Sequence, residues 1–188
     1  MYRGTSVINS PLRWSFGTSS NYTLNPTIFS FSTDGVITTP PRTRAKYLLA
    51  ANANNIGNSK ISIGLNSFAY TLQSDSNSNA IASLPIDLPI GVEITELSVG
   101  VSDFSQNSSV SVVLMEHAFG TTTALEVYSL ETTLADSSGH RVLNSTLSTP
   151  ITIQEGMTYY LEIRLLGSLT NFAEFIDAKI SYTTDQLD

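Results

Sequence analysis

The chain has 188 residues, 41% of them hydrophobic, and a formal net charge of -7, and a globular domain of this length buries about 70% of its unfolded surface. It contains no cysteine, which excludes disulfides, a thiol nucleophile and Cys-ligated zinc or iron-sulfur sites. No apolar run approaches the roughly 20 residues that span a bilayer, and the polar N-terminus lacks the apolar segment of a signal peptide. We therefore expect a soluble protein with no membrane association and no export signal.

The charges divide the chain into two parts. Residues 1–60 carry six basic residues and one acidic residue, a net charge of +5, whereas residues 61–188 carry a net charge of -12. Such an asymmetry indicates an arm with a partner of its own. We predict a basic N-terminal arm over residues 1–59 and a separate domain over residues 60–188.

The predicted arm contains short apolar stretches, and Asp34 with Gly35 forms a hairpin signal after Phe31. A 60-residue arm cannot bury its aromatic side chains alone, so they need the main domain or a partner. Two interpretations of residues 42–54 remain open: a helix that begins after Pro41, or an extended strand over residues 45–49 followed by a flexible linker. The residues expected to mediate assembly are Arg3, Arg13, Trp14, Phe16, Phe29, Phe31, Arg42, Arg44 and Lys46.

The polar composition favours strands. Ser, Thr and Asn together make up 62 of the 188 residues, while charged residues make up only 13%. These short side chains are typical of strands and turns, so helices should be scarce. Composition of this kind is common in secreted β-domains and in virion proteins.

In chain order, alternation of apolar and polar residues predicts strands over most of the second part. Shorter candidates cover residues 61–63, 68–72 and 81–84, and Pro85 and Pro89 confine the next segment to a sheet edge or a connection. Residues 92–102 change parity between Ile94 and Leu97, which predicts a β-bulge near Thr95. Further strands are expected at residues 110–115, 125–127, 142–147, 157–165 and 176–182. The fold class is therefore all-β, an antiparallel β-sandwich or jelly roll with an N-terminal arm.

Candidate catalytic groups are few. His117 and His140 have no zinc-ligand spacing and are interpreted as strand-end or turn residues. Asp136, Ser138 and His140 share one short turn, whereas a nucleophilic triad converges from separate elements. The carboxylates Glu93 and Glu96, Glu126 and Glu131, and Glu162 and Asp177 could pair as in glycosidases, but the alternation places them on solvated faces. Residues 75–79 imitate the start of a calcium loop without its glycine or its closing glutamate. We expect no enzyme activity, no cofactor and no metal.

Two binding interpretations remain. Arg42, Arg44 and Lys46 would line one face of a strand, but the arm is too dilute in charge for firm nucleic-acid binding, so protein contact is favoured. One version sets the +5 arm of one subunit against the -12 body of its neighbour. Aromatic residues of the main domain could instead form a sugar-stacking surface. The candidates for that ligand surface are Tyr160, Phe172 and Phe175, and core positions are the alternative for them.

Several short motifs resemble β-sandwich modules of tailed-phage fibre and head-decoration proteins and of bacterial surface proteins. They are LPIDLPIGVEIT at residues 84–95, Ser102 with Asp103, the Tyr-Tyr-Leu at residues 159–161, and AKISYT at residues 178–183. Upstream, residues 13–18 and 34–37 are similar to repeats of phage fibres. The resemblance implies a role in assembly or adhesion and transfers no catalytic residue.

The sequence thus predicts a non-enzymatic virion structural protein, a fibre, decoration or small capsid subunit that forms homo-oligomers. The alternative is a carbohydrate-binding or adhesion module of a surface protein, with a glycan as its partner. The first interpretation places the chain in the virion, and the second places it outside the cell or on the cell surface.

Overall fold

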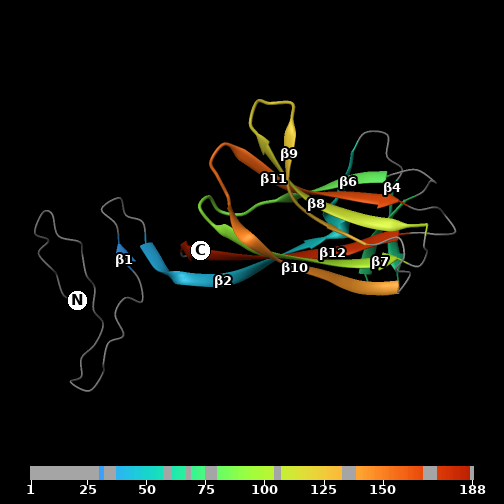
Figure 1. Ribbon diagram of the computed structural model, residues 1–188, viewed down its shortest axis with the longest axis horizontal. Helices are drawn as coiled ribbons and strands as arrows, with labels where there is room; N and C mark the ends of the chain where they lie inside the picture. The colour runs from blue at the N-terminus through green and yellow to red at the C-terminus, as the bar shows by residue number, and fades with distance from the viewer. Residues whose placement is uncertain are drawn as a thin grey trace, which may run out of the picture.

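The computed structural model describes residues 30–31, 37–56, 61–66, 69–74, 80–103, 107–132, 139–166 and 173–186. Every regular element in these ranges is a β-strand, apart from one 3-10 turn at Ala50–Asn52. The strands form two antiparallel sheets that face each other, with β2, β7, β10 and β12 in one layer of Figure 1 and β6, β8, β9 and β11 in the other. This arrangement confirms the predicted all-β sandwich.

The larger sheet, sheet A, is built around the last strand of the chain. On one side β12 (Ala173–Gln186) pairs with β7 (Glu93–Asp103), which pairs in turn with β10 (Gly139–Thr152). On the other side β12 pairs first with β5 (Ala69–Ser74) and then with β2 (Ile37–Leu49). The hairpin strands β4 (Ile61–Asn66) and β1 (Ser30–Phe31) complete the sheet beside β5 and β2.

The smaller sheet, sheet B, has five strands in the order β3-β6-β11-β8-β9. Its central strand β11 (Met157–Leu166) lies between β6 (Ala80–Ile86) and β8 (Ser109–Ala118). The outer strands are β9 (Ala124–Glu131) and the short β3 (Asn54–Asn55). All of these pairings are antiparallel, as the predicted hairpin spacing requires.

The core lies between the two sheets and follows the alternation of the strands. On β11, Leu161, Ile163 and Leu165 are fully buried, while Glu162 and Arg164 between them are partly exposed. Val99 and Ile180 are the corresponding buried residues of sheet A. Each side chain of this size contributes about 1.5–3 kcal/mol on burial, so this one face of each strand supplies most of the stability.

The bulge predicted in the first long strand is present. Ser181 of β12 pairs with Glu96, and the next residue, Tyr182, pairs with Ile94, so Thr95 is the extra residue of β7. The Thr95 hydroxyl donates to the Ser181 carbonyl at 3.3 Å. The bulge is what allows Ile94 and Leu97 both to reach the core although three positions separate them.

Residues 42–54 are the segment for which helix and strand were both left open. The structure places residues 37–49 in β2, where Leu48 pairs with Ala178 and both side chains are buried. The segment therefore begins as a strand, and the 3-10 turn Ala50–Asn52 connects it to β3, which begins at Asn54. The strands β2 and β3 belong to the two sheets of the sandwich. The boundary near residue 60 stays a prediction.

The hairpin predicted at Asp34 and Gly35 has the expected partners, since Phe31 of β1 pairs with Ile37 of β2. Pro85 is also placed as expected. It lies one residue before the end of β6, beyond Ala82 and Ser83, which pair with β3. Among the described residues, therefore, no strand lies where its missing N–H would be needed. No helix among the described residues is long and apolar enough to cross a membrane.

Candidate glycan-binding face

A shallow hollow of about 260 Å³ lies on the outer face of sheet A. Its floor is formed by the middle strand β7, where Ser98 and Gly100 present almost no side chain. Because successive side chains of a strand point to opposite faces, Ser98 and Gly100 face outward while Leu97 and Val99 face the core. The small residues therefore leave a depression at the centre of the sheet.

The walls of the hollow come from the three neighbouring strands. The register places Asn144, Ser98 and Lys179 in one row across β10, β7 and β12, and Tyr47 of β2 extends that row. Val142, Gly100 and Asp177 form the adjacent row. The hollow therefore runs across the strands, from β10 at the edge of the sheet to β2.

The apolar walls of the hollow are exposed. Tyr47 is 67% and Val142 is 62% exposed, and Leu49, which follows Asp177 across the sheet, is exposed as well. Exposed apolar side chains are common singly, but a cluster that flanks a depression indicates a contact surface. Tyrosine suits such a position because its ring is apolar and its hydroxyl is polar.

The polar groups of the hollow differ in how they are engaged. Lys179 Nζ lies 4.0 Å from Glu96 Oε2, and the Ser98 hydroxyl donates to Glu96 Oε1 at 3.3 Å. Among the residues that the structure describes, the side chains of Tyr47, Asn144 and Asp177 form no hydrogen bond. These three groups can therefore bind a polar ligand without breaking a hydrogen bond to another described residue.

Glu96 bonds to three side chains at the border of this hollow. Its Oε2 accepts a hydrogen bond from the Ser181 hydroxyl at 2.9 Å, in addition to the contacts with Ser98 and Lys179. Both carboxylate oxygens thus already serve structural contacts. Among the residues that line the hollow, Asp177 is the sole carboxylate.

The predicted ligand surface of Tyr160, Phe172 and Phe175 is not brought together. Phe175 is 0% exposed and lies in the core, which is the alternative left open for it, so it is not part of a ligand surface. The physical reason is a second register shift, in which Ile176 is the extra residue of β12 and Phe175 takes the inward position. Phe172 lies outside the described residues.

Tyr160 has the outward position that alternation predicted. It is half-buried on the outer face of sheet B, between Pro85 of β6 and Met115 of β8. Burial raises the pKa of its phenol, and the Glu162 carboxylate raises that pKa further. The neighbouring Glu162 accepts a hydrogen bond from Arg164 Nε at 2.7 Å. The two charged side chains beside Tyr160 on this face are therefore paired with each other.

Of the residues predicted to mediate assembly, Arg42, Arg44 and Lys46 do share one face of β2, since they alternate in the same parity as the buried Leu48. Lys46 Nζ donates to the Asp87 carbonyl at 3.0 Å, so it contacts the connection between β6 and β7. Phe31 is described only as part of β1. The remaining members of that set, Arg3, Arg13, Trp14, Phe16 and Phe29, lie outside the described residues. No observation tests an assembly role for any of them.

The candidate catalytic groups stay apart. His117 is the last residue but one of β8, and its Nε2 is 2.8 Å from the Thr121 carbonyl in the following turn, as expected for a structural histidine. His140 is the second residue of β10, on the other sheet. Glu162 and Asp177 lie on the outer faces of opposite sheets. Asp136, Ser138 and residues 75–79 lie outside the described residues, and no group of three potential metal ligands occurs among those described.

One buried polar cluster has a structural role. Asp103, fully buried at the end of β7, contacts the Ser108 hydroxyl and accepts a hydrogen bond from the Thr132 hydroxyl at 3.0 Å. The Thr132 hydroxyl in turn accepts from the Val110 N–H at 2.9 Å, and Arg141 lies 4.0 Å from the Asp103 carboxylate. These bonds tie β7 and β10 of sheet A to residues beside β8 and β9 of sheet B.

The sequence matches no protein-family model and no curated protein. The fold, however, is similar to solved carbohydrate-binding modules at low sequence identity. The C-terminal CBM6 of the laminarinase LamC from Zobellia galactanivorans is 14% identical at a TM-score of 0.47, covering 73% of this chain and 98% of that one. The xylan-binding module CBM15 is 13% identical at a TM-score of 0.47, covering 78% of this chain and 100% of that one.

The CBM22-1 and GH10 modules of endo-1,4-β-D-xylanase 10B from Clostridium thermocellum, complexed with xylohexaose, match with a TM-score of 0.50 and 13% identity. That match covers 75% of this chain and 28% of the larger xylanase chain. At these identities the likeness defines the fold alone: this chain has the β-sandwich that carbohydrate-binding modules use.

These matches correct the resemblance drawn from short motifs. The match with a TM-score of 0.50 is to a chain that carries the module CBM22-1. The interpretation as a virion structural protein is therefore wrong, and the findings favour the alternative that accompanied it. The motifs are not specific to one family. Residues 84–95 correspond to a strand that follows a proline-flanked connection, and residues 178–183 correspond to a closing strand, and many β-sandwiches share both features.

Proposed function

We propose that this chain is a non-catalytic carbohydrate-binding module whose glycan lies across the outer face of sheet A. The observation that carries the proposal is the hollow itself. Exposed Tyr47 and Val142 flank a floor of Ser98 and Gly100, and the side chains of Asn144 and Asp177 beside that floor form no hydrogen bond with another described residue. A sugar ring has an apolar face of C–H groups that stacks on an aromatic ring, and hydroxyls that need hydrogen-bond partners. The hollow offers both kinds of contact.

The shape of the hollow favours a chain of sugars over an enclosed small molecule. Pockets for small ligands usually enclose about 300–1,000 Å³, whereas this hollow measures about 260 Å³ and is open to solvent. It extends over four strands, and neighbouring strands lie about 4.8 Å apart, so the distance from β10 to β2 is roughly 14 Å. A short stretch of a polysaccharide can lie along this span.

The carboxylates of this face support binding without hydrolysis. Glycoside hydrolysis needs two carboxyl groups that face each other across the scissile bond. Asp177 is the sole carboxylate that lines the hollow, and Glu96 below it is held by Ser98, Ser181 and Lys179. The fold is similar to that of modules named for carbohydrate binding, one of which was solved as a complex with xylohexaose. An extracellular or cell-surface location accompanies this function.

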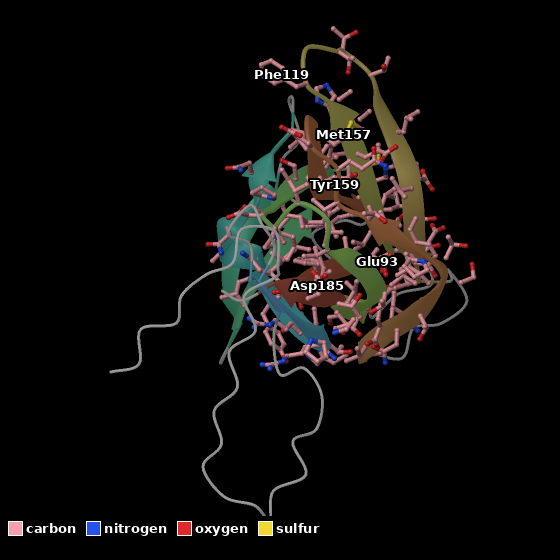
Figure 2. The ribbon with its side chains drawn as sticks, turned by 90° about the vertical axis from the view of Figure 1, so that its left-hand side faces the viewer. Glu93, Phe119, Met157, Tyr159 and Asp185 are labelled. Carbon is pink, nitrogen blue, oxygen red and sulfur yellow. The ribbon has the colours of Figure 1, made fainter. Side chains whose placement is uncertain are left out.

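The test is a titration of the purified chain with neutral hexasaccharides, in which isothermal calorimetry measures Kd. The hexasaccharides are those of β-1,4-linked xylose, glucose and mannose and of β-1,3-linked glucose. We expect Tyr47→Ala to weaken binding at least about tenfold, because burying an aromatic ring contributes about 1.5–3 kcal/mol and 1.4 kcal/mol is a factor of ten in Kd. Phe119→Ala is the matched control, since Phe119 is 89% exposed on the turn between β8 and β9 and projects from the far end of the molecule in Figure 2.

Two results would contradict the proposal. One is the absence of binding to every hexasaccharide of the series by the wild-type chain. The other is binding that Phe119→Ala abolishes and Tyr47→Ala leaves unchanged, because that would place the site on the β8–β9 turn of sheet B.

A further inference from the structure

Gly100 gives the Asp177 carboxylate its place on the sheet. The two residues are direct partners of β7 and β12, and a Cβ added at Gly100 would lie 2.4 Å from Asp177 Oδ1. Real non-bonded atoms do not approach so closely, so any side chain larger than hydrogen at position 100 would displace the carboxylate. Asp177 therefore leans over the β7 backbone, into the hollow, and glycine is the residue that permits it.

Two charged side chains line the hollow, those of Asp177 and Lys179. Lys179 Nζ lies 4.0 Å from Glu96 Oε2, at the border of the hollow. No basic side chain in the part of the chain that the structure describes forms an ion pair with Asp177. The other lining side chains, those of Tyr47, Ser98, Val142 and Asn144, are uncharged. Counted together among the described residues, Asp177, Glu96 and Lys179 leave one excess negative charge at the hollow, on a chain whose net charge is -7.

We infer that Asp177, placed by Gly100, makes this face select uncharged, hydroxyl-rich glycans and reject those that carry carboxylate or sulfate groups; this rests on the proposed function. An ionised carboxylate only accepts hydrogen bonds, and it forms strong, charge-assisted bonds with the hydroxyls of a neutral sugar. An anionic sugar at the same position would be repelled and would leave both charges without a partner. Discrimination by an unfavourable contact of this kind is a common source of specificity.

The experiment compares neutral and anionic probes on the same variants. Calorimetry at low ionic strength measures Kd for the neutral hexasaccharides of xylose, glucose and mannose and for hexagalacturonate, which is anionic. All of these probes have six sugar units. We expect the wild-type chain to bind its best neutral hexasaccharide at least about tenfold more tightly than hexagalacturonate. Since salt shortens the Debye length from about 10 Å at 0.1 M to about 3 Å at 1 M, the ratio should fall as salt is added.

Three variants locate the selectivity. Asp177→Asn keeps the shape of the side chain and removes its charge, so the neutral-to-anionic ratio should fall at least about fivefold. Gly100→Ala displaces the carboxylate, so it should weaken binding of the neutral hexasaccharide. Asp177→Asn should then have a smaller effect on binding in the Gly100→Ala background than in the wild-type chain. Asp87→Asn is the matched control, because it removes the same charge from an exposed site in the connection before β7 and should leave the ratio unchanged.

The outcomes separate the two proposals. If the wild-type chain binds neutral hexasaccharides but binds hexagalacturonate equally well, or if Asp87→Asn changes the ratio as much as Asp177→Asn does, the inference about Asp177 is wrong and the proposed function stands. If no probe binds, the proposed function fails and the inference fails with it. Far-UV circular dichroism of each variant shows whether Gly100→Ala is folded, and Asp177→Asn tests the inference without any change at Gly100.

Discussion

Tyr159 and Tyr160 are adjacent in β11, yet they face opposite sides of sheet B. Tyr159 is buried, and its hydroxyl donates to the Thr152 carbonyl at 3.2 Å, whereas Tyr160 lies on the outer face. Figure 2 shows Tyr159 beneath the turn that carries Phe119. Alternation in the sequence predicted both orientations, because the side chains of a regular strand switch face at every residue.

Tyr159 also links stability to pH. Burial raises the pKa of its phenol above the ordinary value of 10.0, so the folded chain keeps it neutral where the unfolded chain ionises it. Its contribution is therefore fully present below about pH 10 and is lost as the pH rises through the folded pKa. We expect Tyr159→Phe to lower the free energy of unfolding by about 1 kcal/mol at pH 7, through the lost hydrogen bond, and to reduce the further loss of stability above pH 10. Urea unfolding at pH 7, 10 and 11 measures both.

The control for that measurement is Tyr47→Phe, which removes a hydroxyl from an exposed side chain and should leave stability at pH 7 within about 0.5 kcal/mol of the wild type. A Tyr159→Phe variant with wild-type stability at pH 7 and an unchanged decline above pH 10 would contradict the assignment of Tyr159 as a buried, bonded phenol.

The burial of Phe175 could not be predicted from the alternation of apolar and polar residues. The sequence pattern placed Ile176 in the same inward series as Ala178 and Ile180. The structure inserts Ile176 as the extra residue of a register shift, and Phe175 becomes the buried one. The bulge at Thr95 was predictable because the apolar residues themselves change parity there. At this shift Phe175 and Ile176 are adjacent and both apolar, so the sequence contains no parity signal.

At the scale of elements, β2 is the strand that sequence alone could not assign. Its Ala and Leu residues suit a helix as well as a strand, and intrinsic preferences are too weak to decide between them. Pairing with β12 over residues 38–49 decides the matter. The consequence for the site is direct, because only a strand sets Tyr47 and Leu49 on the outer face and Leu48 in the core.

A pair of neighbouring substitutions tests this strand. Leu48 is 6% exposed and Leu49 is largely exposed, so Leu48→Ala should lower the free energy of unfolding by about 2–5 kcal/mol, as a truncation in a core does. Leu49→Ala should change it by no more than about 0.5 kcal/mol. Chemical unfolding of the two variants in parallel is the measurement, and equal losses for both would mean that residues 48 and 49 do not alternate between core and solvent.

At the scale of the whole molecule, the two outer faces of the sandwich differ in character. The face of sheet A has a floor of small residues and exposed apolar walls. The face of sheet B carries Tyr160 beside the bonded pair of Glu162 and Arg164. The proposed glycan binding is therefore assigned to the first face, where polar groups remain unbonded among the described residues.

Half of this site could be predicted from the sequence. Alternation in the last strand indicated that Asp177 and Lys179 point outward, and they do. Tyr47 and Val142 could not be joined to them, because they come from strands about 130 and 35 residues away along the chain and meet Asp177 only through the order β10-β7-β12-β2. Strand order across a sheet depends on long-range pairing, which no local pattern encodes.

Nuclear magnetic resonance can map where a glycan binds on this chain. The 15N-labelled chain is titrated with the neutral hexasaccharide that binds it most tightly, and backbone amide shifts are recorded. We expect the largest shifts on Tyr47, Gly100, Val142, Asn144 and Asp177, from four strands of sheet A. Shifts that instead concentrate around Tyr160 or Phe119 on sheet B, with the sheet A residues unchanged, would contradict this expectation.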